Sequence, residues 1–541
     1  MADEGRGPGV SAGRLGRFLA DGGTRGVAGA AGIVALGFLG SRLLGLLRSV
    51  AIAHAFGTEP ELAAYWVAFR LPDLVFQVLA GATLSAAFIP TFSRVALRGG
   101  DEASWRLASS VLNLIALATT LAAAVAFLLA PLLVPWLAPG LGAEGGDQER
   151  LRALAVDLTR LMLISPVLFG VSGMMTGILN ARQRFLAPAL APLLYNASII
   201  VGAVALAGPL GVRGLALAVV AGSAGHLLVQ LPALRAAGMR WAPSFDLASE
   251  GVREVARLMG PRVLGLAAWQ VNLVVVIFFA SFVSDAAISA VNYAFMIAML
   301  PVAVVGMAIS TAVFPSLAQQ AAARQFTALR QSLSASLRLI LFLAVPASVG
   351  LIALARPAVR LLLERGAFDA DATDLVVGAT AVYAVGIFAH GGIEILSRGF
   401  YALADTRTPV LLAVLSMVVN VVLCALLVAP LGVRGLAAAA SLSAVLEFAL
   451  LLRALQHRLG GLDAPGLRRS AVRTLAATVL MAEALVLLLM LLAVAGVDDG
   501  AAAGALIYCV AGVAVGGATY TLAALALRSE EARLLARRLG R

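Results

Sequence analysis

The chain has 541 residues, of which 61% are hydrophobic and 13% are charged. A soluble globular chain carries about a quarter charged residues, so this composition excludes an ordinary soluble protein and indicates a polytopic membrane protein. The net charge of +11 comes from arginine alone, because the sequence contains no lysine. The arginines gather in alternate loops, which is typical of membrane topology and argues against a nucleic-acid partner.

Apolar runs long enough to cross a hydrocarbon core of ~30 Å recur along the whole chain. They predict an all-α fold with about fourteen transmembrane helices. The helices are expected at residues 27–56, 61–93, 104–137, 151–180, 186–207, 212–236, 254–282, 286–319, 328–356, 372–401, 408–429, 433–456, 471–495 and 503–527.

The loops between these runs alternate in charge. Residues 1–26 are polar and rich in glycine and arginine, without the pattern of a removable signal peptide. The next loop, HAFGTEPEL, has no arginine, the one after it holds Arg94 and Arg98, and the following one is the acidic AEGGDQE. The alternation predicts a multi-pass protein of the cytoplasmic membrane with both termini in the cytoplasm.

The octapeptide PLGVRGLA occurs twice, at Pro209–Ala216 and again 221 residues later at Pro430–Ala437. Two further pairs match at similar offsets: LSAAFIPTF with ISTAVFPSL, and GILNARQRFLAP with GFYALADTRTP. Because six helices separate the copies, they predict two parallel six-helix lobes related by an axis along the membrane normal. The expected parts are a tail (1–26), an N-lobe (27–237), a linker (238–253), a C-lobe (254–458), two appended helices (471–527) and a basic tail (528–541).

The sequence lacks the residues that several kinds of catalytic and binding site need. A P-loop needs a lysine on the phosphates, and the chain has none. The four histidines are scattered, so we expect no metal site, and the two cysteines lie inside apolar runs, so we expect no disulfide. We also expect no cofactor. These residues are His54, His226, His390, His457, Cys424 and Cys509. Asp498–Asp499 is a lone acidic pair, without the second carboxylate cluster that a Mg²⁺–diphosphate enzyme needs. We therefore expect a transporter without catalytic residues rather than an enzyme.

Charged residues inside the predicted membrane spans are candidate functional groups, because they are costly there. Arg42 lies near the middle of the first helix and Arg48 about 9 Å further along it, and that helix has no acidic residue to pair with either. Arg70 could pair with Asp73, three residues further along the helix. A structural role and a functional role are therefore equally expected for Arg70. For the two arginines of the first helix, the alternative is that they snorkel or bind backbone carbonyls.

The second half of the chain offers fewer candidates. Glu394 precedes Arg398 by four residues, the favourable order for a structural ion pair within one helix. Arg262 follows Gly260-Pro261 just inside the seventh helix and could be interfacial. The polar residues Gln230, Gln270, Asn272 and Asn292 are typical of contacts between helices.

The ordered motifs resemble the MurJ/MviN family, within the superfamily that also contains MATE exporters and polysaccharide flippases. They are SRLLGLLRSVAIAHAFG, AFRLPDL, LSAAFIPTF, LNARQRFLAPALAPLLYN, GLALAVVAGSAGHLLVQLPAL, MGPRVLGLAAWQVN, FASFVS, AISTAVFPSL and GFYALADTRTP, and the resemblance covers about residues 29–458 and the two last helices. It implies a flippase for lipid II, the undecaprenyl-diphosphate-linked peptidoglycan precursor. It also implies that Arg42, Arg48 and Arg70 bind the anionic head group in a central cavity.

The sequence departs from the pattern of that family at several positions. Phe76-Gln77 stand where a basic pair is usual, and Ala63 where an acidic residue opens the second helix. Met296 replaces an arginine and Val276 an Asp or Asn. We therefore consider Arg262 as a substitute cation, and a relative that moves another lipid-linked glycan as the second reading.

Two further readings come from other functional classes. An exporter of organic cations should present carboxylates, whereas this chain presents arginines. A non-transporting scaffold would recruit cell-wall synthesis proteins through its last two helices and basic tail.

Overall fold

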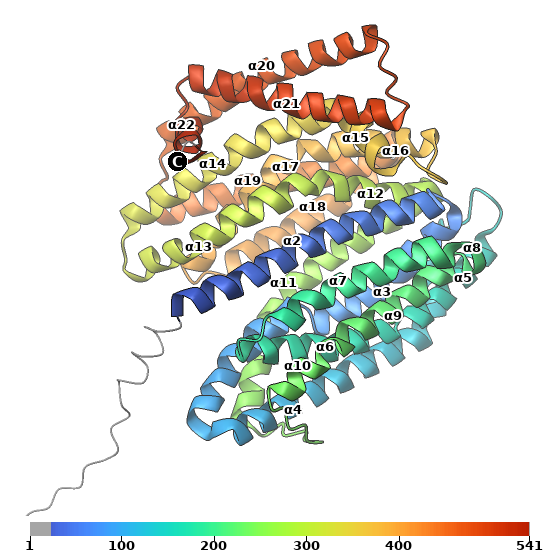
Figure 1. The fold of residues 1–541 in the computed structure, drawn as a ribbon, viewed down its shortest axis with the longest axis vertical. Coiled ribbons are helices and arrows are strands. Elements are labelled where there is room, and N and C mark those ends of the chain that lie inside the picture. Colours follow the sequence, from blue (N-terminus) through green and yellow to red (C-terminus); the bar gives the residue numbers. More distant parts are fainter. Residues whose placement is uncertain (1–22, 540–541) are drawn as a thin grey trace, which may run out of the picture.

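The computed structural model describes residues 23–539, without the side chains of residues 23–31, 82–86, 260–269, 304–305, 308 and 535–539. Over this range the chain forms helices and no strand, as the apolar runs predict (Figure 1). The helices are α2 (Gly23–Phe56), α3 (Pro60–Leu79), α4 (Ala82–Leu137), α5 (Gln148–Met162), α6 (Ile164–Ala181), α7 (Leu186–Val201), η1 (Gly202–Leu206), α8 (Ala207–Leu210), α9 (Val212–Leu228), α10 (Leu231–Ala236), α11 (Glu250–Ser281), α12 (Asp285–Pro301), η2 (Val302–Gly306), α13 (Met307–Ala322), α14 (Phe326–Ala353), α15 (Ala355–Leu363), α16 (Ala370–Val385), α17 (Ile387–Ala402), α18 (Arg407–Leu431), α19 (Val433–Leu459), α20 (Ala464–Val494), α21 (Ala502–Ala526) and α22 (Glu530–Leu539).

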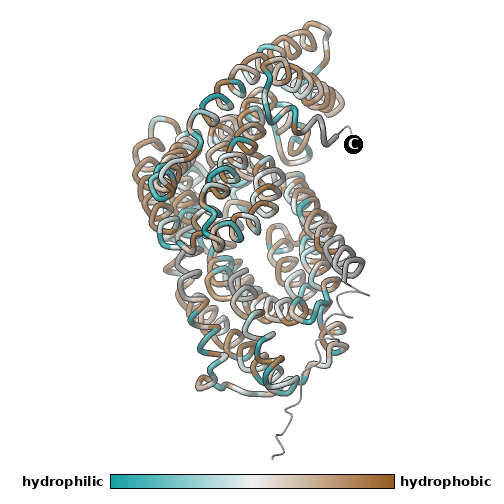
Figure 2. The backbone as a smooth tube through the Cα atoms, turned by 90° about the vertical axis from the view of Figure 1, so that its left-hand side faces the viewer, coloured by the Kyte–Doolittle hydropathy of each residue, from teal (hydrophilic) through white to brown (hydrophobic). Residues whose placement is uncertain are grey.

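Hydrophobic residues run along most of these helices, as the tube in Figure 2 shows. Among the described residues, eleven helices are long and apolar enough to cross a membrane, or up to twelve if each bent pair is one span. The expected count of fourteen is therefore not confirmed. Ala87–Leu137 counts once, although its 51 residues reach about 76 Å and Gly100 breaks its helical backbone. Gln270–Ser281 and Asp285–Pro301 count as shorter apolar helices.

The two copies of PLGVRGLA form the same turn. Gly211 has φ 56° and ψ −144°, and Gly432 has φ 55° and ψ −131°, a region that favours glycine. In each copy the glycine N–H donates to the carbonyl four residues earlier, Ala207 or Val428. The repeated sequence therefore has a repeated structural task, which is to end one helix and begin the next.

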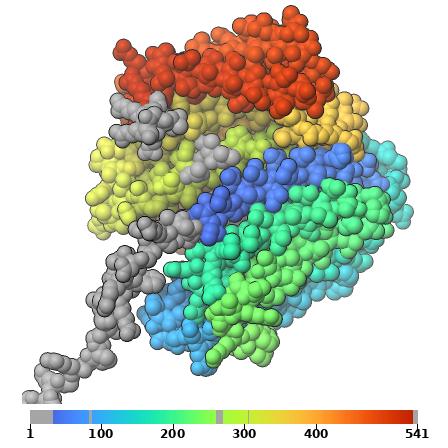
Figure 3. Space-filling model, viewed as in Figure 1, coloured from blue at the N-terminus to red at the C-terminus, as the bar shows by residue number. Residues whose placement is uncertain are grey.

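The helices gather into two bundles and an appended pair; in Figure 3 the appended pair is red, the C-lobe yellow to orange, and the N-lobe blue to green. Helices α2–α10 form the N-lobe, and α12–α19 form the C-lobe. Helices α20 and α21 lie side by side on the outside of the C-lobe, where the Tyr520 hydroxyl donates to the Phe342 carbonyl at 2.6 Å. Helix α11 contacts both lobes, because Val252 near its start packs in an N-lobe core and Ile277 near its end packs in a core shared by both lobes.

The lobes share one hydrophobic core at one end of the molecule only. We call this the closed end; its loops are residues 57–59, 138–147, 282–284 and 364–369, and its core contains residues from both lobes. At the opposite end, which we call the split end, each lobe has its own core, built around Phe92 in the N-lobe and Phe400 in the C-lobe. Among the described residues, only α11 and the segment before it carry hydrogen bonds or ion pairs between the lobes there, such as Arg94–Glu254.

Glycines permit the close approach at the closed end. A Cβ on Gly57 would lie 2.2 Å from the Ala367 carbonyl oxygen, and one on Gly140 would lie 2.0 Å from that of Ser281. The Gly140 N–H donates to the Ser281 hydroxyl at 3.2 Å. Backbone from the two lobes therefore meets directly, with no side chain in between.

Candidate functional site

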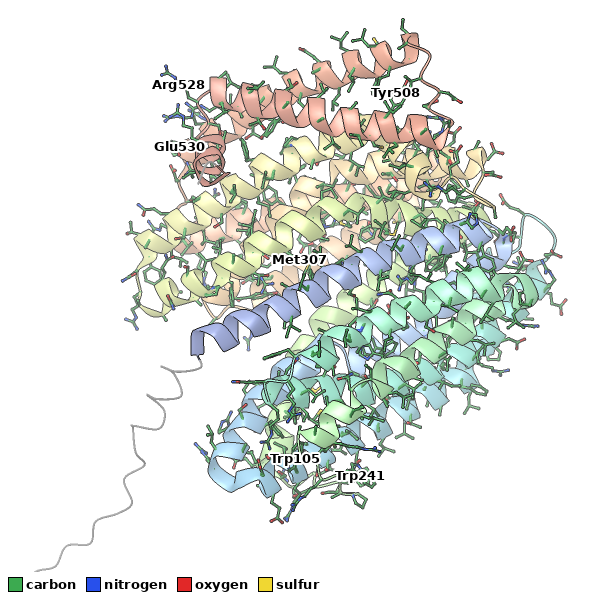
Figure 4. The ribbon with its side chains drawn as sticks, viewed as in Figure 1. Trp105, Trp241, Met307, Tyr508, Arg528 and Glu530 are labelled. Atoms are coloured by element: carbon green, nitrogen blue, oxygen red, sulfur yellow. The ribbon has the colours of Figure 1, made fainter. Side chains whose placement is uncertain are left out.

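Helix α2 lies along the seam between the lobes (Figure 1). It packs closely on α7, because a Cβ on Gly37 would lie 2.6 Å from that of Ala189. It also contacts the C-lobe across the seam: an Nη of Arg42 lies 3.7 Å from the sulfur of Met307, which Figure 4 labels on α13. The helix that carries the two central arginines is therefore in contact with both lobes.

Arg42 has no acidic partner among the described residues. Its side chain is exposed, and its guanidinium lies 5.1 Å from the centre of the Phe38 ring. An aromatic face and a thioether hold a guanidinium weakly and do not neutralise it. The positive charge remains available to an anion.

Arg48 is half-buried on the same helix. It forms no hydrogen bond and no ion pair with any described residue, and it lies within electrostatic reach of the phenols Tyr65 and Tyr195. An unpaired arginine at the centre of a membrane helix costs at least ~2.5 kcal/mol. That cost marks Arg48 as a candidate ligand for an anionic group.

Arg70 contacts the opposite lobe instead of its expected neighbour. An Nη of Arg70 donates to Oδ1 of Asn292 on α12 at 2.6 Å, and its Nε is buried without a partner. Asp73 is close enough to interact electrostatically but forms no ion pair with Arg70; it accepts from Gln270 on α11 at 3.2 Å. The expected pair within α3 is therefore replaced by two contacts across the seam, and Asn292 and Gln270 are residues that spacing within one helix does not reveal.

The remaining candidates lie away from this group. Arg262 belongs to α11, but its side chain lies outside the part of the chain that the structure describes. Glu394 and Arg398 on α17 form no ion pair, because the guanidinium of Arg398 lies over the Phe314 ring at 5.5 Å. The ion pair expected between these two residues of α17 is therefore not formed. Both residues act on Tyr401 electrostatically.

No described group of three or more His, Cys, Asp or Glu side chains is arranged to hold a metal ion. His226 instead belongs to a polar network inside the N-lobe. One of its ring nitrogens lies 2.6 Å from the Ser172 hydroxyl, and Gln230 donates to that hydroxyl at 2.7 Å. Gln230 therefore joins helices, the role expected of it from the sequence.

Comparison with known proteins places this geometry in a family. The family model described as "Lipid II flippase MurJ" matches residues 52–497. This chain belongs to the MurJ family. It is 32% identical over 451 residues to the protein of Burkholderia cenocepacia named "Lipid II flippase MurJ", covering 82% of this chain and 86% of that one. The "Probable lipid II flippase MurJ" of Vibrio cholerae is 30% identical over 423 residues, covering 77% of this chain and 80% of that one.

Solved structures agree on the fold. A structure titled "Lipid II flippase MurJ, inward closed conformation" matches with a TM-score of 0.75 at 22% identity, over 94% of this chain and 99% of that one. An inward-facing MATE family transporter of the MOP superfamily matches with a TM-score of 0.64 at 16% identity, over 77% of this chain and 94% of that one. This MurJ family member thus shares its fold with the MurJ structure and with the MATE structure.

The positions where this chain departs from the MurJ pattern are largely packed. Ala63 is fully buried, and Met296 and Val276 pack against the shared core at the closed end. The Phe76 ring lies 5.1 Å from that of Phe169, and Gln77 donates weakly to Asp73 at 3.5 Å. The described seam of this MurJ family member therefore presents Arg42, Arg48 and Arg70 as its central cations.

Proposed function

We propose that this chain translocates lipid II across the bacterial cytoplasmic membrane by alternating access. Arg42, Arg48 and Arg70 would bind the diphosphate, since a guanidinium matches phosphate oxygens bidentately. The observation that carries the proposal is Arg48, a half-buried membrane cation without a hydrogen-bonding or charged partner among the described residues. Membership of the MurJ family supports the choice of lipid II over other anions.

The arrangement of the cores supports a state that is open to the cytoplasm. The arginine-rich loops lie at the split end, and by the positive-inside rule that end and both termini are cytoplasmic. The head group would enter between the lobes there and reach Arg48. Rocking of the N-lobe (27–237) against the C-lobe (254–458) would then break the closed end and release the lipid outside.

A related lipid-linked glycan is the second candidate substrate. The observation in its favour is that Phe76 stacks on Phe169 where the family pattern has a basic residue, so fewer cations face the seam. A scaffold that recruits cell-wall synthesis proteins through helices 471–527 and the tail 528–541 is the candidate from another class. Neither of these two candidate functions requires Arg42 and Arg48 to bind lipid II.

The test is complementation of a bacterium depleted of its lipid II flippase. The wild-type chain should restore growth and bring lipid II head groups to the outer face. A double variant, Arg42→Ala with Arg48→Ala, should insert normally and do neither, whereas Arg98→Ala, an exposed cation near the Gly100 bend, should behave as wild type. Rescue by the double variant would show that translocation does not need Arg42 and Arg48, and wild-type expression without rescue would favour another glycan or the scaffold.

A further inference from the structure

The two lobes differ at one charged pair next to the repeated turns. In the N-lobe, an Nη of Arg213 lies 3.8 Å from a carboxylate oxygen of Asp157 on α5. Arg213 belongs to the first copy of PLGVRGLA, and its counterpart in the second copy is Arg434. Among the described residues, Arg213 has an acidic partner and Arg434 has none.

The counterpart of Asp157 follows from the burial pattern of α5 and α16. Five buried positions on α5 recur 221 residues later on α16, including Thr159 and Thr380; they are Leu151, Ala155, Leu158, Thr159 and Met162, and then Ala372, Val376, Ala379, Thr380 and Tyr383. At the same offset, the residue of α16 that corresponds to Asp157 is Gly378. The C-lobe therefore has a hydrogen atom where the N-lobe has a carboxylate.

Arg434 faces this gap. A Cβ on Gly378 would lie 2.6 Å from Nε of Arg434, so the guanidinium lies against the bare helix backbone. Arg434 is exposed and forms no hydrogen bond or ion pair with any described residue. Arg434 is therefore a cation without an ion-pair partner in the part of the chain that the structure describes.

The gap is part of a pocket of about 410 Å³ at the closed end. Its lining includes Arg356, Asp374, Gly378 and Arg434. Arg356 is already paired with Asp374 at 2.8 Å, so Arg434 gives the pocket a net positive charge. A volume of this size is within the range of sites for small ligands, about 300–1,000 Å³.

We propose that this pocket between α15, α16 and α19 binds the phosphate of a phospholipid head group. A free guanidinium offers two parallel N–H donors to phosphate oxygens, the geometry that makes arginine a phosphate ligand. The pocket lies at the end of membrane helices, where head groups are found. The site lies outside the seam, so it does not depend on the proposed transport reaction.

Two variants remove the site in different ways, and the N-lobe supplies the control. Gly378→Asp places a carboxylate at the position of Asp157, and the three atoms nearest its new Cβ all belong to the guanidinium group of Arg434. Arg434→Gln removes the cation and keeps a polar side chain. Arg213→Gln is the matched control, because it makes the same change in the other copy of the turn, where Asp157 already occupies the partner position.

The measurement is native mass spectrometry of the full-length protein, which counts the lipids retained when phosphatidylglycerol or diacylglycerol is added. Wild type and Arg213→Gln should retain one phosphatidylglycerol at concentrations at least tenfold below those that Gly378→Asp and Arg434→Gln need. Equal retention in all four proteins, or equal retention of diacylglycerol, would overturn the proposal. So would loss of the lipid in Arg213→Gln.

A second arm separates a lipid from a soluble phosphate. Radiolabelled inorganic pyrophosphate is added to the delipidated wild-type protein and to the same variants. No pyrophosphate binding that depends on Gly378 or Arg434 is expected, because the acyl chains contribute to the affinity for the lipid. Pyrophosphate binding that Gly378→Asp abolishes would replace the phospholipid by a soluble phosphate as occupant. Equal unfolding temperatures of the four proteins would show that the comparison concerns the site alone.

Discussion

Arg70 and Asn292 join the two lobes through a hydrogen bond of 2.6 Å, although they are 222 residues apart in the chain. The bond connects a candidate cation on α3 with the helix that opens the C-lobe. A transporter that alternates between two states must break such contacts and form them again. The strength of this bond should therefore set how readily the closed end opens.

Substitution of Asn292 should change the stability of the closed end in opposite directions, depending on the new side chain. Asn292→Asp adds a charge to the bond, which should stabilise the closed end and slow head-group appearance at the outer face. Asn292→Ala leaves Arg70 without its partner and should lower the free energy of unfolding by about 1.5–3 kcal/mol. Asn420→Ala is the control, because it breaks an amide contact with Asn272 that involves neither Arg70 nor the N-lobe. Identical transport rates in Asn292→Asp and wild type would contradict this role.

Gly140→Ala should force the closed end apart. The added methyl group would lie 2.0 Å from the Ser281 carbonyl oxygen, so one lobe has to move. We expect a loss of about 1–3 kcal/mol in the stability of this state, measured as a lower unfolding temperature. Gly145→Ala in the same loop is the control, because no atom lies within 4 Å of its added methyl group. Equal unfolding temperatures in both variants would show that Gly140 does not determine the approach of the lobes.

The sequence predicted the membrane class, the repeat and the turns because these depend on local composition. The turn glycines Gly211 and Gly432 repeat, so the letters alone revealed them. Partners across the seam could not be predicted in this way: spacing within α3 favoured Asp73 for Arg70, whereas tertiary packing supplied Asn292. The missing Glu394–Arg398 pair has the same cause, since Phe314 from another helix binds the guanidinium.

The charge alternation of the loops predicts the orientation of the chain. A reporter that is active only in the cytoplasm should be active after Gly99 or Arg541 and inactive after Glu144 or Asp499. The first of these positions lies at the split end, and Glu144 lies in a closed-end loop. Activity after Asp499 would contradict the assignment of α20 and α21 as two crossings.

The parallel repeat predicts that both PLGVRGLA turns face the same side of the membrane. Val212 and Val433 inside the turns are buried, so cysteines there would label poorly. Leu210 and Leu431 precede the turn glycines and are 44% and 49% exposed. Cysteines at these two positions, in a protein without Cys424 and Cys509, should react equally from the outside with a membrane-impermeant reagent. Reaction of the two from opposite sides would contradict a parallel repeat.

The chemistry of Arg48 can be tested by two substitutions that separate charge from shape. If Arg48 binds a diphosphate, Arg48→Ala should abolish the appearance of head groups at the outer face, with expression and insertion unchanged. Arg48→Lys should restore it only in part, because an ammonium keeps the charge but loses the planar pair of donors.

If the arginine only snorkels to the membrane surface, lysine should serve equally well. Alanine should then be tolerated too, since it removes an unpaired charge that costs at least ~2.5 kcal/mol. The two accounts thus differ in the order of the variants: wild type above lysine above alanine for a ligand, and all three alike for a snorkelling residue. Full transport by Arg48→Ala would remove the main support for a diphosphate site on α2.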